Sequence, residues 1–298
     1  MFGRKRTGSV LCTSCGVLVG VNDDKCYNCG RRNPALWGFA PALRTLGNDL
    51  GFVPFVVGLC IIVYGLTMLA SAGIGGGSVN FFAPHVLAVW IFGASGAGAV
   101  FHEGRWWTVL SAGWLHGNLI HIAVNMMSLR TLAPLIADFY GPARMVIIYT
   151  AGSVAGFVLS SVAAEYFPVI QLAFVSLGGN PNPAAHMTVG ASAALAGLLG
   201  AFAYYGRRSG SRAISTQSSQ WIVSMFVYGL LLPIIDNYAH LGGLAGGYLV
   251  ARWLDPLKKE RPDHVVMALL CLAASLAAIT FSAVTGIIEW RRYLAGIN

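Results

Sequence analysis

The chain has 298 residues, of which 56% are hydrophobic and only 10% are charged, and its formal net charge is +8. This composition excludes an ordinary soluble domain, because soluble domains carry about 25% charged residues. Several apolar runs approach the roughly 20 residues that a helix needs to cross a bilayer. We therefore predict an all-α polytopic membrane protein. We interpret the excess positive charge as a signal of membrane orientation and expect no nucleic-acid partner.

Residues 1–35 are polar and contain four of the six cysteines, in two Cys-x-x-Cys-Gly motifs. The glycine of such a motif permits a tight turn, and two motifs together can supply a tetrahedral four-thiolate zinc site. Metal binding would then stabilise a segment that is too short for a core of its own. Disulfides or a redox dithiol are the alternative, which the reducing cytosol expected at this end disfavours. The predicted zinc ligands are Cys12, Cys15, Cys26 and Cys29.

Residues 36–50 are interpreted as a linker, and the apolar runs after them predict seven membrane-spanning helices. Between the first two spans, residues 81–107 are also apolar, but Pro84 and four glycines interrupt them. Because proline and repeated glycines disfavour a continuous helix, we expect a long loop that dips into one leaflet. The predicted spans are approximately 52–72, 115–136, 144–164, 188–206, 220–235, 238–254 and 264–288.

The distribution of Lys and Arg predicts how these spans are oriented, because cytoplasmic loops carry most of the positive charge. With the N-terminus inside and residues 81–107 not crossing, only Arg105, Arg291 and Arg292 lie outside, which leaves 16 of the 19 Lys and Arg inside. If residues 81–107 crossed, the division would be 10 against 9. We expect a multi-pass protein with a cytosolic N-terminus, in a bacterial cytoplasmic membrane.

Three of the spans bring polar side chains to a similar depth below the outer surface. Ser192, His240 and the pair His121 and Asn125 lie within about two turns of the outer ends of their spans. Polar groups at that depth are costly unless they face one another or a water cavity. His121 and Asn125 are four residues apart and share one helix face. His116 precedes this face and receives a supporting role.

Small residues beside Ser192 and His240 predict that their helices approach each other closely. The run Gly242–Gly247 contains two small-xxx-small pairs, which permit close helix packing. Such packing would bring Ser192 within hydrogen-bond reach of His240, which a serine nucleophile requires because its hydroxyl is weak until a base accepts its proton. Asp236 could orient His240 as a third member of a triad. A role as N-cap of the incoming helix is the interpretation we favour for Asp236.

Three separated motifs resemble those of the rhomboid intramembrane serine proteases. They are the array His116-x4-His121-x3-Asn125, the run Gly190-Ala-Ser192 and the run Asn237-x-Ala-His240-x-Gly-Gly.

This resemblance covers about residues 50–255 and implies a six-helix core with a Ser192–His240 dyad that needs no cofactor. It also implies an oxyanion site built from the side chains of His121 and Asn125 with the Ser192 amide. His116, Gly190 and Asn237 would support the site. The loop before His116 would be the family's membrane-dipping first loop, and the last span would be an added seventh helix.

Three positions depart from the family pattern. Ala193 stands where glycine usually follows the serine, and Thr108 stands where an arginine follows two tryptophans. Ala196 stands where an aromatic side chain commonly stacks on the catalytic histidine. The missing aromatic would leave His240 less well oriented, which bears on catalytic efficiency.

The sequence thus predicts a zinc-ribbon-like head (1–35), a linker (36–50), a rhomboid-like six-helix core (51–256) and a loop with an extra transmembrane helix (257–298). The implied activity is cleavage of transmembrane protein substrates near the outer membrane face. A catalytically weak or inactive rhomboid-like protein that binds transmembrane helices is the alternative. A transporter or proton relay using the same histidines is a third possibility, disfavoured because the spans carry no pair of acidic residues.

Overall fold

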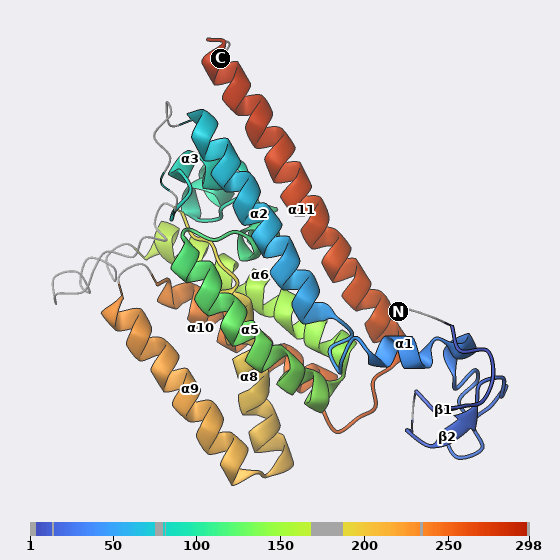
Figure 1. The fold of residues 1–298 in the computed structure, drawn as a ribbon. Helices are drawn as coiled ribbons and strands as arrows, with labels where there is room; N and C mark the ends of the chain where they lie inside the picture. The colour runs from blue at the N-terminus through green and yellow to red at the C-terminus, as the bar shows by residue number, and fades with distance from the viewer. Residues whose placement is uncertain are drawn as a thin grey trace. The chain divides into compact units, whose positions relative to one another are not determined.

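The chain forms two compact units in this computed structural model, Met1–Phe52 and Val53–Asn298. The structure describes residues 4–13, 15–74, 80, 82–167, 187–232 and 235–296 (Figure 1). Most of the described chain is helical, as the composition predicts.

The first unit is a small β-hairpin followed by short helices. Its elements are β1 (Ser9–Leu11), β2 (Leu18–Gly20), the 3-10 helix η1 (Leu36–Gly38) and α1 (Ala40–Arg44). The two strands are antiparallel, and Val10 pairs with Val19 in the buried interior. The backbone N–H of Lys5 donates to the carbonyl oxygen of Gly38 at 2.9 Å and fastens η1 to the start of the chain. The compact unit therefore includes residues 36–50, which the sequence analysis interprets as a linker.

Seven helices of 18 or more residues lie in the described part of the chain. They are α2 (Phe52–Ile74), α5 (Leu119–Tyr140), α6 (Pro142–Tyr166), α8 (Ser192–Ser209), α9 (Arg212–Leu231), α10 (Asn237–Leu254) and α11 (Pro262–Leu294). Four of them, α2, α5, α6 and α11, are long and apolar enough to cross a membrane. The crossing of α8, α9 and α10 stays a prediction. Most side chains of α8 are buried inside the protein. This helix therefore needs few large apolar side chains, because little of it would face lipid.

The largest difference between a predicted span and a helix of the described chain is at the start of α9. The apolar run predicts a span over residues 220–235, whereas α9 begins at Arg212, because the Ser211 side chain accepts a hydrogen bond from the backbone N–H of Ile214 as its N-cap. The polar first half of α9 has no apolar pattern and was therefore not recognisable as part of a span. Residues 233 and 234 of the predicted span lie outside the described residues.

The stretch between α2 and α5 is broken into short turns, as its glycines predict. Its elements are α3 (Val86–Ile91), the π-helix η2 (Gly98–His102), α4 (Thr108–Ser111) and the 3-10 helix η3 (Ala112–Trp114). None of the helices in the described residues 82–118 exceeds six residues. We call residues 82–118 the first loop; its depth in the membrane stays a prediction.

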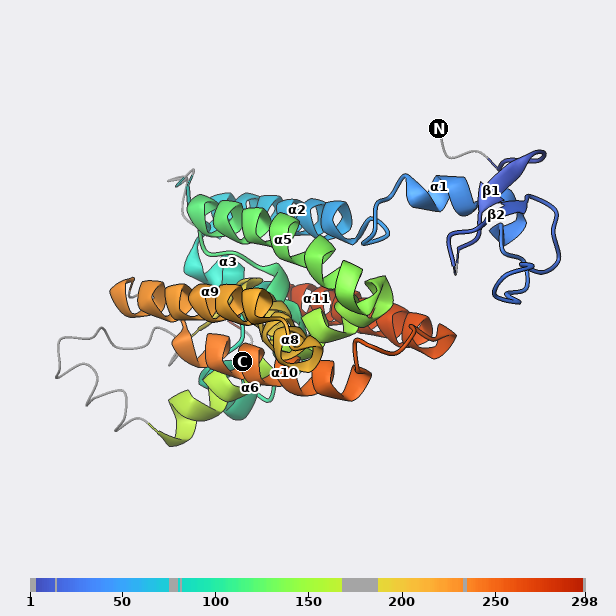
Figure 2. The same ribbon diagram turned by 90° about the horizontal axis from the view of Figure 1, so that it is seen from below.

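Close backbone contacts hold α6, α8 and α10 together at the centre of the second unit (Figures 1 and 2). A side-chain carbon added to Gly152 of α6 would lie 2.7 Å from the Cα atom of Gly197 in α8. One added to Gly247 of α10 would lie 2.5 Å from the carbonyl carbon of the same Gly197. Real side-chain carbons do not approach this closely, so glycine at these positions permits the three backbones to meet.

Hydrogen bonds from charged side chains cap the N-terminus of α6 and the C-terminus of α10, at the ends distant from Ser192. The buried Arg144 side chain donates through Nη1 to the carbonyl oxygens of Leu254, at 3.0 Å, and Asp255, at 3.1 Å, at the C-terminus of α10. In return, Oε1 of Glu260 accepts a hydrogen bond from the backbone N–H of Arg144 at 3.0 Å, in the first turn of α6. Charges of these signs suit the helix ends that they contact. Arg144 thus ties α6 to the C-terminus of α10, and Glu260, in the loop that follows α10, caps α6.

Candidate active site and metal centre

Ser192 is the first residue of α8, and the segment before it is held on both sides. Thr188 and Ser95 of the first loop exchange two backbone hydrogen bonds, of 3.1 and 2.7 Å. The N–H of Gly190 donates to the carbonyl oxygen of Ala112 at 3.0 Å. Because Ser192 opens the helix, its own N–H has no acceptor within the helix. That amide is therefore a donor to any group beside the serine.

Gly190 brings the two predicted oxyanion residues to this segment. Its φ of +123° is unfavourable for other residues, and an added side-chain carbon would lie 2.5 Å from Nε2 of His121 and 3.8 Å from Nδ2 of Asn125. Asn125 Nδ2 donates to the carbonyl oxygen of His121 at 2.9 Å. The loop before Ser192 therefore lies directly against both side chains.

The start of α5 is itself fixed by neighbouring side chains. Asn118 is its N-cap, and its Oδ1 accepts from the backbone N–H of His121 at 2.8 Å. The buried ring of His116 lies edge-on to the ring of His121, with 5.1 Å between centroids. His116 therefore packs against His121, and its supporting role stays a prediction.

His240 lies buried in the first turn of α10, and Asp236 is the N-cap of this helix. The Oδ1 atom of Asp236 accepts hydrogen bonds from the backbone N–H groups of Tyr238 and Ala239, both at 3.0 Å. Its Oδ2 atom accepts from the hydroxyl of Ser160. This confirms that Asp236 caps the helix. Within the described residues, Nδ1 of His240 has no hydrogen-bond partner.

The neighbours of Ser192 and His240 meet at one glycine of α6. A side-chain carbon on Gly156 would lie 2.5 Å from the carbonyl oxygen of Ala239 and 2.7 Å from Cβ of Ala193. Ala193 and Ala239 follow Ser192 and precede His240, respectively, and both belong to the same buried apolar cluster. The first turns of α8 and α10 therefore lie at one level and side by side.

One further contact lies at the edge of the candidate site. A side-chain carbon on Gly229 of α9 would overlap the side chain of Asn237, so Asn237 packs toward α9. The predicted residues on α5, α8 and α10 thus lie at one end of these helices, and the side chain of Asn237 faces α9.

The sequence analysis did not single out Gly156, Ser95 or Thr188. Gly152 and Gly156 have the same small-xxx-small spacing as the glycines of α10, and that spacing was a usable signal. The pairing of Ser95 with Thr188 joins loops 93 residues apart and has no sequence signature.

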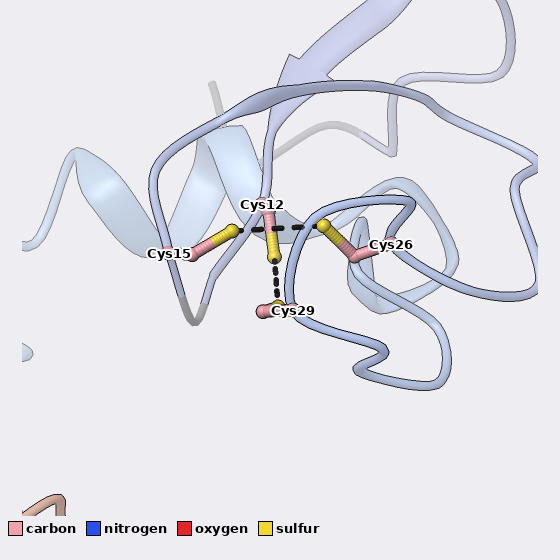
Figure 3. A group of neighbouring side chains, drawn as sticks. All are labelled: Cys12, Cys15, Cys26 and Cys29. Atoms are coloured by element: carbon pink, nitrogen blue, oxygen red, sulfur yellow. Dashed lines mark hydrogen bonds between the residues drawn. The ribbon is translucent and has the colours of Figure 1, made fainter.

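The four cysteines of the first unit also converge. Their sulfur atoms all lie within 4.8 Å of one another, with 3.7 Å between Cys12 and Cys29 and 3.6 Å between Cys15 and Cys26 (Figure 3). Four sulfurs about 2.3 Å from a central zinc ion would be about 3.8 Å apart in a tetrahedron. The cluster therefore has the dimensions of a four-thiolate metal site.

The backbone of the two cysteine motifs repeats closely. Gly16 N–H donates to the carbonyl oxygen of Cys12 at 3.0 Å, and Gly30 N–H donates to that of Cys26 at 2.9 Å. Both glycines have positive φ values, which such turns require. A backbone hydrogen bond at Val17 lowers the pKa of Cys15 to about 6. The thiolate, which is the form that binds metals, is thus favoured at Cys15.

The known proteins that this chain resembles all belong to one family. A family model described as the Rhomboid domain matches residues 103–255. Rhomboid protease GluP of Bacillus subtilis is 30% identical over 212 residues, which are 70% of this chain and 37% of GluP. The putative rhomboid protease YdcA of the same organism is 26% identical over 181 residues, 59% of this chain and 81% of YdcA. RHOMBOID-like protein 1 of Arabidopsis thaliana is 27% identical over 182 residues, 56% of this chain and 39% of that protein.

We predict that Gly243→Val separates the first turns of α8 and α10. A side-chain carbon at Gly243 would overlap the carbonyl oxygen of Ala193 and lie 3.2 Å from Cβ of Ala196. Overpacking of this kind costs about 1–3 kcal/mol in stability. Thermal unfolding in detergent should show this loss, and a serine-directed covalent probe should label Ser192 much more slowly. Gly65→Val in α2 is the matched control, because nothing lies within 4 Å of an added carbon there. Equal behaviour of the two variants would contradict the packing.

Proposed function

Because this chain belongs to the rhomboid family, we propose that it is an intramembrane serine protease that cleaves transmembrane protein substrates with a Ser192–His240 dyad. The chain is an integral membrane protein, and four helices among its described residues are long and apolar enough to span a membrane. The observation that carries the proposal is the meeting of α8 and α10 at Gly156 and Gly243, next to the contact of Gly190 with His121. The alignment spans little more than a third of GluP, so the activity is argued from these contacts.

In the proposed reaction, His240 accepts the proton of the Ser192 hydroxyl while its oxygen attacks the scissile carbonyl carbon. The negative charge that develops on the carbonyl oxygen is stabilised by the side chains of His121 and Asn125 and by the Ser192 N–H. His240 then gives its proton to the leaving amine, and the acyl-enzyme is hydrolysed by water. Asp236 is assigned the role of helix cap rather than that of a third triad member, because its carboxylate oxygens accept the capping hydrogen bonds of α10 and that of Ser160.

We propose that the site opens toward the outer face and that the N-terminus is cytosolic, because this orientation places 16 of the 19 Lys and Arg inside. The relatives named above come from a bacterium and a plant, so the proposal does not extend to the kind of membrane. The six-helix core would then consist of α2, α5, α6, α8, α9 and α10, with α11 as the seventh helix.

A weak or inactive protein that binds transmembrane helices is the second candidate, and Ala196 is the observation that favours it. Ala196 is buried, and its Cβ lies 3.2 Å from the position of an added carbon on Gly243. An alanine there supplies no ring to stack on His240. The two candidates differ in whether Ser192 reacts at an appreciable rate.

Ser192→Ala and His240→Ala are each predicted to abolish cleavage of a panel of transmembrane substrates in detergent or liposomes. The double variant should be no worse than either single variant, because a nucleophile and its base act as a unit. Gel-based cleavage assays and labelling by a fluorophosphonate probe measure the two effects. Cleavage that survives in Ser192→Ala would sink the proposal, and a wild-type protein that neither cleaves nor labels would favour the second candidate.

Asn125→Ala and His121→Ala are predicted to lower kcat about 100- to 1,000-fold each, with a smaller change in KM. Each removes one donor to the developing oxyanion, and losses of this size are typical of such donors. His264→Ala at the start of α11 is the matched control, because its ring accepts only from the backbone N–H of Arg261 in the described contacts. Wild-type turnover in both site variants would remove the oxyanion assignment and leave the dyad standing.

For the head, we propose a structural zinc ion bound by Cys12, Cys15, Cys26 and Cys29. The support is the spacing of the four sulfurs and the small size of the buried core that surrounds Cys12 and Cys26. When bound, the zinc would cross-link the two turns, and catalysis would need no metal.

Cys12→Ser combined with Cys15→Ser is predicted to release one zinc per chain and to make the head protease-sensitive. Cleavage of substrate should be largely retained, because the head is a compact unit separate from the one that holds Ser192. Elemental analysis, limited proteolysis and the cleavage assay test these outcomes together. Cys271→Ser in α11 is the control and should keep its zinc. Undiminished zinc in the double variant would refute the ligand assignment.

A further inference from the structure

Helix α11 lies outside the residues matched by the family model, yet it contacts the first loop through one polar side chain. Ser282 is fully buried, and its hydroxyl oxygen accepts a hydrogen bond from Nε1 of Trp107 at 3.0 Å. It also lies 3.3 Å from the hydroxyl of Ser111. Burying a hydroxyl and an indole N–H is costly unless they are paired. The contact therefore holds Trp107 and Ser111 at one place on α11.

The other serine and threonine side chains of α11 make their hydrogen bonds within the helix itself. Ser275, Thr280 and Thr285 each donate to carbonyl oxygens of α11 itself. One helical turn beyond Ser282, a side-chain carbon on Gly286 would lie 2.5 Å from the carbonyl oxygen of Ile91. Ser282 and Gly286 thus form one contact face for the first loop, and the ring of Trp107 packs edge-on against Phe281 with 4.6 Å between centroids.

The first loop passes this contact on to the segment before Ser192. The hydroxyl of Ser111 donates to the carbonyl oxygen of Gly93 at 2.8 Å, two residues before Ser95. Ser95 exchanges both backbone hydrogen bonds with Thr188. Ala112, the residue after Ser111, accepts from the N–H of Gly190. Ser95 and Ala112, which bond the segment before Ser192, therefore lie within two residues of Gly93 and Ser111. Ser282 contacts Ser111, and Ser111 bonds Gly93.

We infer that α11 positions the nucleophile, and that Ser282 and Gly286 are positioning residues for Ser192 acting through the first loop. The catalytic part of this inference rests on the function proposed above. The chain of contacts runs from Ser282 to Ser111, from there to the backbone at Gly93 and Ala112, and then to Thr188 and Gly190. Displacement of the first loop would shift Gly190 relative to His121, and therefore Ser192 relative to its oxyanion donors.

The test compares Ser282→Ala and Gly286→Ala in the full-length protein with two controls on the same helix. Thr280→Ala also removes a hydroxyl, but that group is exposed and bonds its own helix. Ala277→Val adds bulk on an exposed face. Fluorophosphonate labelling of Ser192 reports on its positioning. Hydrogen exchange of the Thr188 and Gly190 amides reports on the segment independently of activity, and thermal unfolding reports on stability.

Ser282→Ala and Gly286→Ala are expected to speed exchange of the two amides and to slow labelling about 10- to 100-fold, as small misplacements of reacting groups do. The two control variants should leave both quantities unchanged. In Ser282→Ala and Gly286→Ala, the fold decrease in kcat should exceed the fold change in KM. If the wild type labels and either readout stays unchanged in both variants, the inference is wrong. If the amides respond but the wild-type protein never labels, the structural connection stands and the proposed protease function fails. Ser282→Ala removes a hydrogen bond, whereas Gly286→Ala adds a carbon atom at a close contact. If one variant fails to fold, the other still decides the result.

Discussion

The close approach of three backbones at Gly152, Gly197 and Gly247 is the constraint on which the rest of the second unit depends. In a bilayer, lipid tails are as apolar as leucine, so helices associate through close packing and hydrogen bonds rather than through the hydrophobic effect. Glycine maximises such packing because it removes the side chain between two backbones. Here the same contacts align the first turns of α8 and α10, which carry Ser192 and His240.

The polar groups at this end of the bundle show how the site differs from a soluble triad. In a triad, a carboxylate orients the histidine. Here the available carboxylate, Asp236, is committed to the N-terminus of α10 and to Ser160. His240 is instead held by the position of its helix, and its Nδ1 has no partner in the described chain. Orientation of the base thus depends on helix packing, which makes the glycine contacts part of the catalytic apparatus in the proposed function.

Much of this arrangement could be predicted from sequence, and the reasons for success and failure are physical. Apolar runs and helical spacing are local, so the long helices and the shared face of His121 and Asn125 were predictable. Residue type alone allowed Asp236 to be either the N-cap of α10 or the third member of a triad. Its hydrogen bonds to the backbone of α10 identify it as the cap. The contact of Ser282 with Ser111 joins residues 171 positions apart. Nothing in the local pattern of a serine in an apolar helix signals such a partner.

The head and α11, which both lie outside the matched residues 103–255, relate differently to the proposed site. The head before α2 forms its own compact unit, and its cysteines have the spacing to stabilise it through a metal. Changes there need not reach Ser192. Helix α11, by contrast, shares buried hydrogen bonds with the first loop, whose backbone pairs with the serine segment. Without α11, the indole N–H of Trp107 would lose its acceptor, Ser282. Leaving such a buried donor unpaired would cost about 1–3 kcal/mol in folding stability, so α11 contributes to the folding of the first loop. Helix α11 is therefore bound to the first loop by hydrogen bonding, whereas the head forms a compact unit of its own.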